Sequence, residues 1–315
     1  MQFWPRKRAY RPVARVRSWA KSDKSSLLGF AGYKVGMTHI VVEDTRPKSL
    51  TVGERIVLPV TVVECPPIKI ATVRLYEKAD GLRLTSEIFV KTDKDLSRKL
   101  NTPKKDAKTL DSIKPEDFDE IRVNVYTQPK LTSIGKKKPE FFEMAVGGNK
   151  EEALEYVKNN VGKEINVKDI FSDGQLIDTH VVTTGKGYQG PVKRFGVSIR
   201  SAKSEKVKRA AGSIAGGWKA HGHMMYRVPD AGQMGFHMRT EYNKQIISIL
   251  ENPSDVNPSG GFLRYGNVKN TYVLIKGSVG GPKKRLIRFC KPIRSKAEPS
   301  APKLVQISKK SKQGK

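Results

Sequence analysis

The placement of positive charge is the feature that most constrains this chain. Its 60 Lys and Arg residues against 31 Asp and Glu residues give a formal net charge of +29. Nearly all of this excess lies in residues 1–25, 185–245 and 283–315, whose net charges are +7, +9 and +11. The rest of the chain is close to neutral, as in an ordinary folded domain. We therefore expect a globular body whose basic segments enter a polyanion, with nucleic acid as the partner.

Composition and cysteine placement narrow the class of protein further. Hydrophobic residues make up 37% of the chain, which is enough for a packed core. Cys65 and Cys290 lie far apart, and the absence of a Cys-x-x-Cys pair argues against a disulfide framework, a zinc ribbon and a redox dithiol. No signal-peptide core and no apolar stretch of about 18 residues is present. We expect a soluble cytoplasmic protein with no membrane partner.

Strand-like patterns occur at both ends of the chain. Short β-branched runs such as THIVVED, RIVLPVTVVE and IATVRLYEK lie between Leu27 and Val90, and QIISIL, TYVLIKG and RLIRFCKPI follow after residue 244. Ala79-Asp80-Gly81 predicts a hairpin turn. Because strands flank the intervening material, the pattern predicts a mainly β body, a closed barrel into which other segments are inserted.

The segment 91–164 has a different texture, mixed in charge and permissive for helices. Apolar residues recur at helical spacing between Asn149 and Gly162, which predicts one amphipathic helix. The segment is almost neutral, so we interpret it as a packing unit and not as the main ligand surface. A strand, QLIDTHVVTT, then leads into the basic internal segment.

The motif GKGYQG, from Gly185 to Gly190, matches the G-x-G-x-x-G pattern of dinucleotide sites. Such a site needs a helix with an apolar face, whereas the residues after Pro191 read VKRFGVSIRSAKSEKVKR and are basic. We therefore interpret the glycines as allowing the backbone to approach phosphates closely. Lys186, Lys193 and Arg194 would supply the charge.

Catalytic and metal-binding groups are not recognisable in the basic internal segment. His221 and His223 form an H-x-H pair without a nearby Cys, Asp or Glu to complete a metal shell. The segment has only three acids and no evident pair of nucleophile and base. We expect no catalytic residue, metal, cofactor or small-molecule substrate. Two alternatives stay open, an RNA-modifying enzyme that uses the glycine loop for a nucleotide cofactor and a general DNA binder.

Aromatic residues are interleaved with cations in the basic segments. Trp218 in GSIAGGWKAHGHMMY could stack on an unpaired base, with Lys219, His221 and Arg227 close to phosphates. Trp4, Tyr10 and Trp19 lie among Arg and Lys residues near the N-terminus. Both arrangements suit RNA. The alternatives are that Trp218 folds back onto the body and that the N-terminal aromatics pin their segment to the domain.

Four segments carry a family resemblance. GFAGYKVGMTHIVVED, PVTVVECPP, TTGKGYQGPVKRFGV and AGQMGFHMRTEYNK resemble the universal large-subunit ribosomal protein L-three family in its archaeal form. The resemblance implies a six-stranded barrel of the translation-protein type with an α/β insertion. It also implies binding to large-subunit (23S-type) rRNA early in assembly, neighbouring ribosomal proteins as partners, and a loop that runs toward the peptidyl transferase centre.

The resemblance also assigns places to individual residues. Trp218 would lie near the loop tip, Lys186, Lys193 and Arg194 on the outgoing arm, and Gln233, His237 and Arg239 on the returning arm. The full set of expected RNA-binding residues is Arg6, Lys7, Arg8, Arg11, Arg15, Arg17, Lys186, Lys193, Arg194, Arg200, Lys208, Arg209, Trp218, Lys219, His221, Arg227, Gln233, His237, Arg239 and Lys244.

These observations predict a division of the chain into a body and its extensions. The expected parts are a basic N-terminal extension (1–25), the first part of the barrel (26–90), the mixed α/β insertion (91–164), a barrel strand region (165–184), the basic Gly-rich internal loop (185–245), the last part of the barrel (246–295) and a basic C-terminal tail (296–315).

Overall fold

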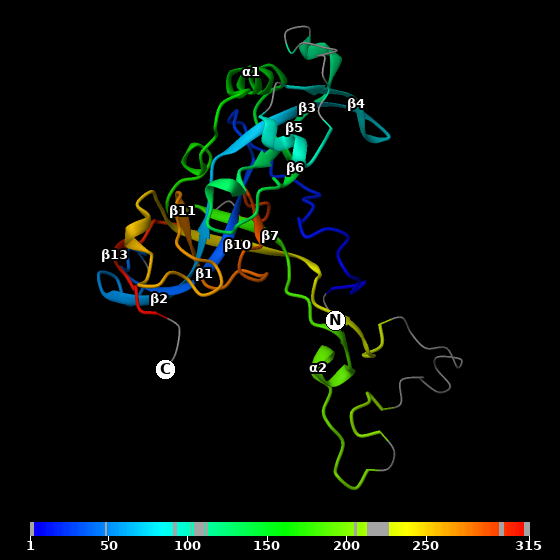
Figure 1. Ribbon diagram of the computed structural model, residues 1–315, viewed down its shortest axis with the longest axis vertical. Helices are drawn as coiled ribbons and strands as arrows, with labels where there is room; N and C mark the ends of the chain where they lie inside the picture. The colour runs from blue at the N-terminus through cyan, green and yellow to red at the C-terminus, as the bar shows by residue number, and fades with distance from the viewer. Residues whose placement is uncertain are drawn as a thin grey trace. The chain divides into compact units, whose positions relative to one another are not determined.

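The computed structural model describes residues 3–47, 49–90, 93–101, 103, 110, 113–204, 207–212, 227–295 and 299–311. The chain divides into two compact units (Figure 1). We call Met1–Pro12 with Val182–Arg239 the arm unit, and Val13–Val181 with Thr240–Lys315 the body unit. Each unit is described by itself.

The larger sheet lies in the body unit and joins strands from both ends of the chain. Its strands are β1 (Gly29–Glu43), β2 (Arg55–Glu64), β7 (Leu176–Val182), β10 (Met238–Leu250), β11 (Tyr272–Lys276), β12 (Leu286–Cys290) and β13 (Lys303–Ile307). The order is β12-β7-β10-β11-β2-β1-β13, and β12 also pairs with β1. Six strands therefore pair in a ring with β13 beside it, and the predicted mainly β fold is confirmed.

Strand β13 belongs to the stretch that the sequence analysis assigned to a basic tail. It pairs antiparallel with the end of β1, where Ile40 lies opposite Ile307 and Glu43 opposite Lys303. The high charge of residues 283–315 concealed this strand, because an edge strand needs apolar side chains on one face only.

Close approach of β1 and β2 depends on one glycine. A Cβ atom on Gly32 would lie 2.6 Å from the Cys65 Sγ and 2.9 Å from the Glu64 carbonyl oxygen. Both distances are too short for non-bonded carbon contacts, so only glycine fits where the two strands meet.

A second, four-stranded sheet forms the other part of the body unit (Figure 1). It consists of β3 (Ile68–Ala79), β4 (Gly81–Phe89), β5 (Glu120–Thr127) and β6 (Phe141–Ala145), in the order β4-β3-β5-β6. The predicted hairpin is confirmed, since Ala79 pairs with Gly81. The sequence analysis had grouped residues 68–90 with the barrel. They pair in this sheet instead, because β-branched runs do not reveal which distant strand will be the partner.

Helix α1 (Lys150–Asn160) packs beside this sheet and buries Ala153, Leu154 and Val157, which confirms the predicted helix. Short 3-10 turns span Lys94–Arg98, Pro115–Asp117, Pro129–Leu131, Val167–Asp169 and Pro253–Asp255. None of the helices within the described residues is long and apolar enough to cross a membrane.

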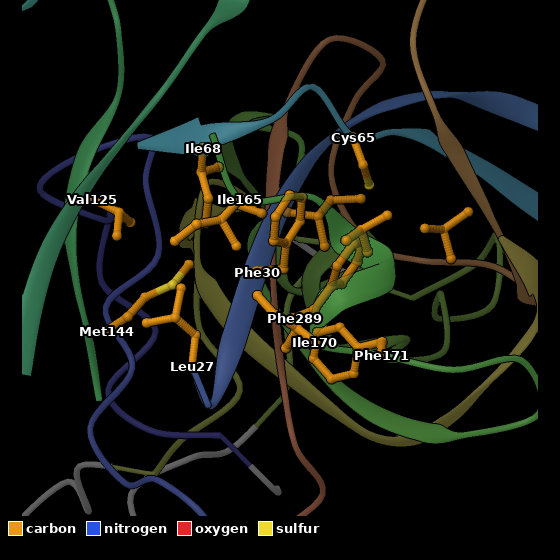
Figure 2. Packing of buried hydrophobic residues seen from close by; sticks show 14 of the residues in the cluster. Leu27, Phe30, Cys65, Ile68, Val125, Met144, Ile165, Ile170, Phe171 and Phe289 are labelled. Atoms are coloured by element: carbon orange, nitrogen blue, oxygen red, sulfur yellow. The ribbon is translucent and has the colours of Figure 1, made fainter. Parts of the chain in front are cut away.

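One hydrophobic core runs through the body unit and joins the two sheets. Figure 2 shows Phe30 of β1, Phe289 of β12, Met144 of β6 and Ile68 of β3 within one cluster of buried side chains. All four side chains are completely or almost completely buried. The buried side chains of the second sheet therefore belong to the same hydrophobic core as those of the ring.

The arm unit contains only short elements. Strands β8 (Gly187–Gln189) and β9 (Gly232–Met234) pair antiparallel, and helix α2 (Pro191–Phe195) follows β8. Because these elements are so short, the fold of the arm unit also depends on hydrogen bonds and ring contacts outside regular secondary structure.

Buried His180 of β7 makes the stability of the body unit depend on pH. Its side chain is 6% exposed, and Nδ1 lies 2.9 Å from the Thr240 hydroxyl. Burial, and then the charge of Arg288, lowers the His180 pKa to about 4 from 6.5. The unfolded chain thus takes up this proton near pH 6.5, whereas the folded protein does so only near pH 4.

We expect the stability that depends on neutral His180 to be complete above pH 6.5 and to be lost as the pH falls to about 4, by about 3 kcal/mol. Urea unfolding of the full chain at several pH values measures this loss. In His180→Gln the dependence between pH 6.5 and 4 should be shallower by that amount. Identical pH profiles for the two proteins would contradict the prediction.

Candidate nucleic-acid interface

The base of the internal loop is held together by backbone pairing. We define the loop base as residues 183–195 and 230–239. The β8–β9 ladder is extended by hydrogen bonds from Thr183 N to the His237 carbonyl oxygen (2.9 Å) and from Lys186 N to the Met234 carbonyl oxygen (2.9 Å). The outgoing and returning arms of the loop therefore run side by side as a ribbon.

A tight turn in the returning arm requires glycine. Gly235 has a φ of +72°, and a Cβ atom there would lie 2.0 Å from the Thr184 carbonyl oxygen. No other residue type fits without displacing the opposite arm.

The N-terminal segment also belongs to the arm unit and forms hydrogen bonds with the loop base. Ala9 N donates to the Phe236 carbonyl oxygen at 2.7 Å, and His237 Nδ1 lies 2.8 Å from the Lys7 carbonyl oxygen. Residues 3–9 are thus fixed to the loop base within one compact unit. The sequence analysis listed these residues and the returning arm separately, since nothing in the local pattern links them.

Guanidinium groups and aromatic rings alternate across this unit. Arg6 lies over Phe195 (4.3 Å to the ring centroid), Arg8 over Phe236 (5.7 Å), Arg194 over Phe195 (5.0 Å) and Arg239 over Phe3 (4.4 Å), and Trp4 stacks on Phe195 (6.2 Å between centroids). Cation–π attraction offsets part of the repulsion between these like charges. The result is a concentrated positive surface in which guanidinium groups lie over aromatic rings.

Burial and the repulsion between neighbouring guanidinium groups both affect the pKa values of the arginines in this unit. Burial, followed by the charge of Arg6, lowers the pKa of both Arg194 and Arg239. Both guanidinium groups stay charged at neutral pH because the ordinary arginine value is so high. An anion that entered this field would relieve the repulsion, so the arrangement favours phosphate.

Most of the predicted RNA-binding cations are exposed. In the arm unit these are Lys7, Arg8, Arg11, Lys186, Lys193, Arg200, Lys208, Arg209 and Arg227, and in the body unit Arg15 and Arg17. The last two alternate with buried Ala14 and Val16 along an extended segment. The exposed side chains of Arg15 and Arg17 are therefore available to phosphates.

Other predicted residues are used inside the fold. The Arg194 Nε donates to the Gln233 carbonyl oxygen (3.1 Å) and its Nη1 to the Asp230 carbonyl oxygen (2.8 Å), so this side chain ties the two arms together. The Gln233 amide donates to the Gly235 carbonyl oxygen at 3.0 Å. Lys244 pairs with Glu241 at 3.3 Å. Arg194 and Gln233 thus form hydrogen bonds within the loop base, and Lys244 forms an ion pair within the body unit.

His237, which the resemblance placed on the returning arm among the expected RNA-binding residues, is a buried residue. It is 7% exposed, because the N-terminal segment lies over it, and burial lowers its pKa. A neutral ring beside the Lys7 carbonyl oxygen fixes the N-terminal segment, a contact that no local pattern predicts because Lys7 is so distant along the chain.

The predicted loop tip falls in residues 213–226, outside the described part of the chain. Trp218, Lys219 and His221 lie outside the described residues. Their contacts with RNA stay predictions. Of the other tryptophans, Trp19 packs against the core of the body unit, which agrees with the alternative that N-terminal aromatics pin their segment.

The G-x-G-x-x-G segment does not open a dinucleotide-binding unit. Residues 187–189 form β8 of the antiparallel ribbon, and the helix that follows, α2, has only five residues. A βαβ unit needs a parallel strand after a long crossover helix. The geometry therefore favours the interpretation that the glycines form a tight ribbon among cations.

Sequence reasoning missed one exposed pair in the body unit. The Arg294 guanidinium lies 4.0 Å from the centroid of the Tyr242 ring, and both side chains are exposed. The two residues are far apart in sequence and come together because β10 and β12 both pair with β7.

Fold and surface together define a class of protein, a mainly β body that carries basic segments in which cations and aromatic rings are interleaved. A family model described as Ribosomal protein L3 matches residues 1–314. The chain is 48% identical to a protein of Archaeoglobus fulgidus, over 100% of this chain and 97% of the relative, and 45% identical to one of Methanocaldococcus jannaschii, over 100% and 96%. The chain belongs to the ribosomal protein L3 family.

Both relatives carry the name large ribosomal subunit protein uL3. The resemblance noted in the sequence, including its archaeal form, is confirmed by these full-length matches. The family and the relatives are named as ribosomal proteins and not as enzymes, which agrees with the expectation of a structural protein.

Proposed function

We propose that this chain is a structural constituent of the large ribosomal subunit that binds 23S-type rRNA and promotes early assembly. In the cell it would be cytoplasmic and ribosome-bound, with other large-subunit proteins as neighbours. The observation that carries the proposal is the separation of charge along the chain, since nearly all of the basic excess lies in residues 1–25, 185–245 and 283–315 and the remaining residues are close to neutral. Membership of the ribosomal protein L3 family supports the same function.

The proposal assigns different tasks to the parts of the chain. The ring of six strands would be a closed barrel that lies on the particle, while the extensions neutralise phosphates inside it. The internal loop would run toward the peptidyl transferase centre with Trp218 near its tip. Exposed cations such as Lys186 and Lys193 would contact phosphates directly, and Arg194 would hold the arms that present them.

Binding should weaken steeply with salt, because each phosphate contact releases condensed counterions. We expect Lys193→Ala to reduce the slope of log affinity against log salt by roughly 0.7 to 0.9. The measurement is the affinity of the full chain for large-subunit rRNA at several salt concentrations. Lys163→Ala is the matched control, since Lys163 is an exposed lysine of the insertion and its loss should leave the slope unchanged.

Sedimentation of the native protein through a sucrose gradient, before and after a high-salt wash, tests the assembly itself. Co-migration with the large subunit is the expected result. Migration as a free protein would reject the proposal and return the choice to the RNA-modifying enzyme and the general DNA binder. Equal affinity for duplex DNA and for rRNA would favour the DNA binder.

A further inference from the structure

The exposed Tyr242–Arg294 pair lies in the body unit. Tyr242 is on β10, and its ring is 40% exposed. Arg294 follows β12, and its guanidinium carbon is 4.0 Å from the ring centroid, which is close for a cation–π contact. Ile293, beside Arg294, is exposed as well.

An unusual backbone conformation presents the tyrosine. Asn243 has a φ of 55°, in the left-handed region, although it lies inside β10. Side chains normally alternate between the faces of a strand, yet Tyr242 and Asn243 are both exposed. A left-handed residue within a strand is uncommon and persists where its surroundings enforce it.

One buried carboxylate enforces the arrangement on both chain segments. Asp178 of β7 is fully buried and accepts hydrogen bonds from Asn243 N (2.8 Å) and from Ile293 N (3.0 Å). Its two oxygens thus fix the backbone next to Tyr242 and the backbone next to Arg294. The surface pair is preorganised by a group beneath it, so little ordering is left to be done on binding.

We infer that the Tyr242–Arg294 pair is a stacking site for an unpaired base of large-subunit rRNA. Aromatic rings and guanidinium planes are the two protein surfaces on which unpaired bases stack, and here both lie in one rigid pair. Arg294 also belongs to the basic segment 283–315, so the site attracts the RNA backbone. The inference rests on the proposed function and names a contact that the charge pattern alone did not indicate.

Stacking and phosphate contact differ in their dependence on salt, and the test uses that difference. In Tyr242→Ala we expect the affinity of the full chain for large-subunit rRNA to fall by roughly five- to a hundredfold with an unchanged salt slope. Tyr242→Phe keeps the ring and should bind like the wild type. Arg294→Lys keeps the charge but loses the planar group, so it should bind more weakly with the same slope.

The matched control is Leu84→Ala in β4, whose side chain is 43% exposed and lies in the second sheet. It should leave the affinity unchanged. Urea unfolding of each variant tests its folding. Base-specific chemical modification of rRNA in the complex gives a second readout, since a base protected by the wild type should become reactive with Tyr242→Ala.

Equal affinity and equal base protection for Tyr242→Ala and the wild type would overturn the inference and leave the proposed function intact. A crosslink from Tyr242 to a neighbouring protein in place of a base would also overturn it. If the wild type itself shows no preference for rRNA over duplex DNA, the proposed function fails instead.

Discussion

Glu64→Ala is expected to lower the free energy of unfolding of the body unit by about 4 kcal/mol. Glu64 ends β2 and is fully buried. Its carboxylate accepts hydrogen bonds from the Tyr265 hydroxyl, from Lys269 N (2.9 Å) and from Asn270, through both the backbone N (3.0 Å) and the side-chain Nδ2 (2.7 Å).

The loss is large because removal of the carboxylate leaves several donors without a partner in the interior. Each buried donor left unsatisfied costs about 1–3 kcal/mol, and water that enters the cavity recovers part of it. Tyr265 stays protonated as a donor, since burial and the Glu64 charge raise its pKa. The loop 256–270 therefore loses its anchor to the ring when Glu64 is removed.

Urea unfolding of the full chain measures this effect, with two variants as controls. Glu64→Gln keeps the shape but turns one acceptor oxygen into a donor, so about half of the loss is expected. Tyr265→Phe removes a single donor and should cost about 1 kcal/mol. A Glu64→Ala protein within 1 kcal/mol of the wild type would show that solvent replaces the carboxylate.

The strands were predictable from sequence, but their distribution between two sheets was not. RIVLPVTVVE coincides with β2, because its buried half is β-branched and Pro and Gly mark its surroundings. IATVRLYEK has a similar strand-like composition, yet it lies in β3 and pairs in the second sheet with β4 and β5. A strand's own residues fix its conformation, whereas the choice of partner depends on packing against distant segments such as Met144 in the common core.

The candidate site could likewise be predicted from the sequence only in part, because some of its contacts join residues that are distant along the chain. Charge density identified the exposed cations, because exposed lysines and arginines need no particular partner. The burial of His237 depends on the N-terminal segment lying over the loop base, and the internal use of Arg194 depends on the returning arm. No local pattern encodes either contact. The Tyr242–Arg294 pair likewise exists only after β7, β10 and β12 have come together around Asp178.

Arg288→Ala is expected to destabilise the body unit by about 3 kcal/mol and to release the segment 13–19. Arg288 of β12 is 3% exposed, and burial lowers its pKa to about 10, so it is still charged at neutral pH. Its Nη1 donates to the Ala14 carbonyl oxygen (3.0 Å) and its Nη2 to the Glu143 carbonyl oxygen. The guanidinium also lies 4.6 Å from the Phe142 centroid.

One side chain thus joins the ring, the second sheet and the start of the basic extension. Burying the charge of Arg288 among carbonyl oxygens and aromatic rings costs free energy. Its two charge-assisted hydrogen bonds stabilise the protein because they hold two chain segments together. Arg288→Met separates these contributions, because it keeps the bulk beside Trp19 and lacks the donors. We expect it to be more stable than Arg288→Ala but to share faster proteolysis at Arg15 and Arg17. Cleavage there at the wild-type rate in both variants would show that Trp19 and Val16 hold the extension without Arg288.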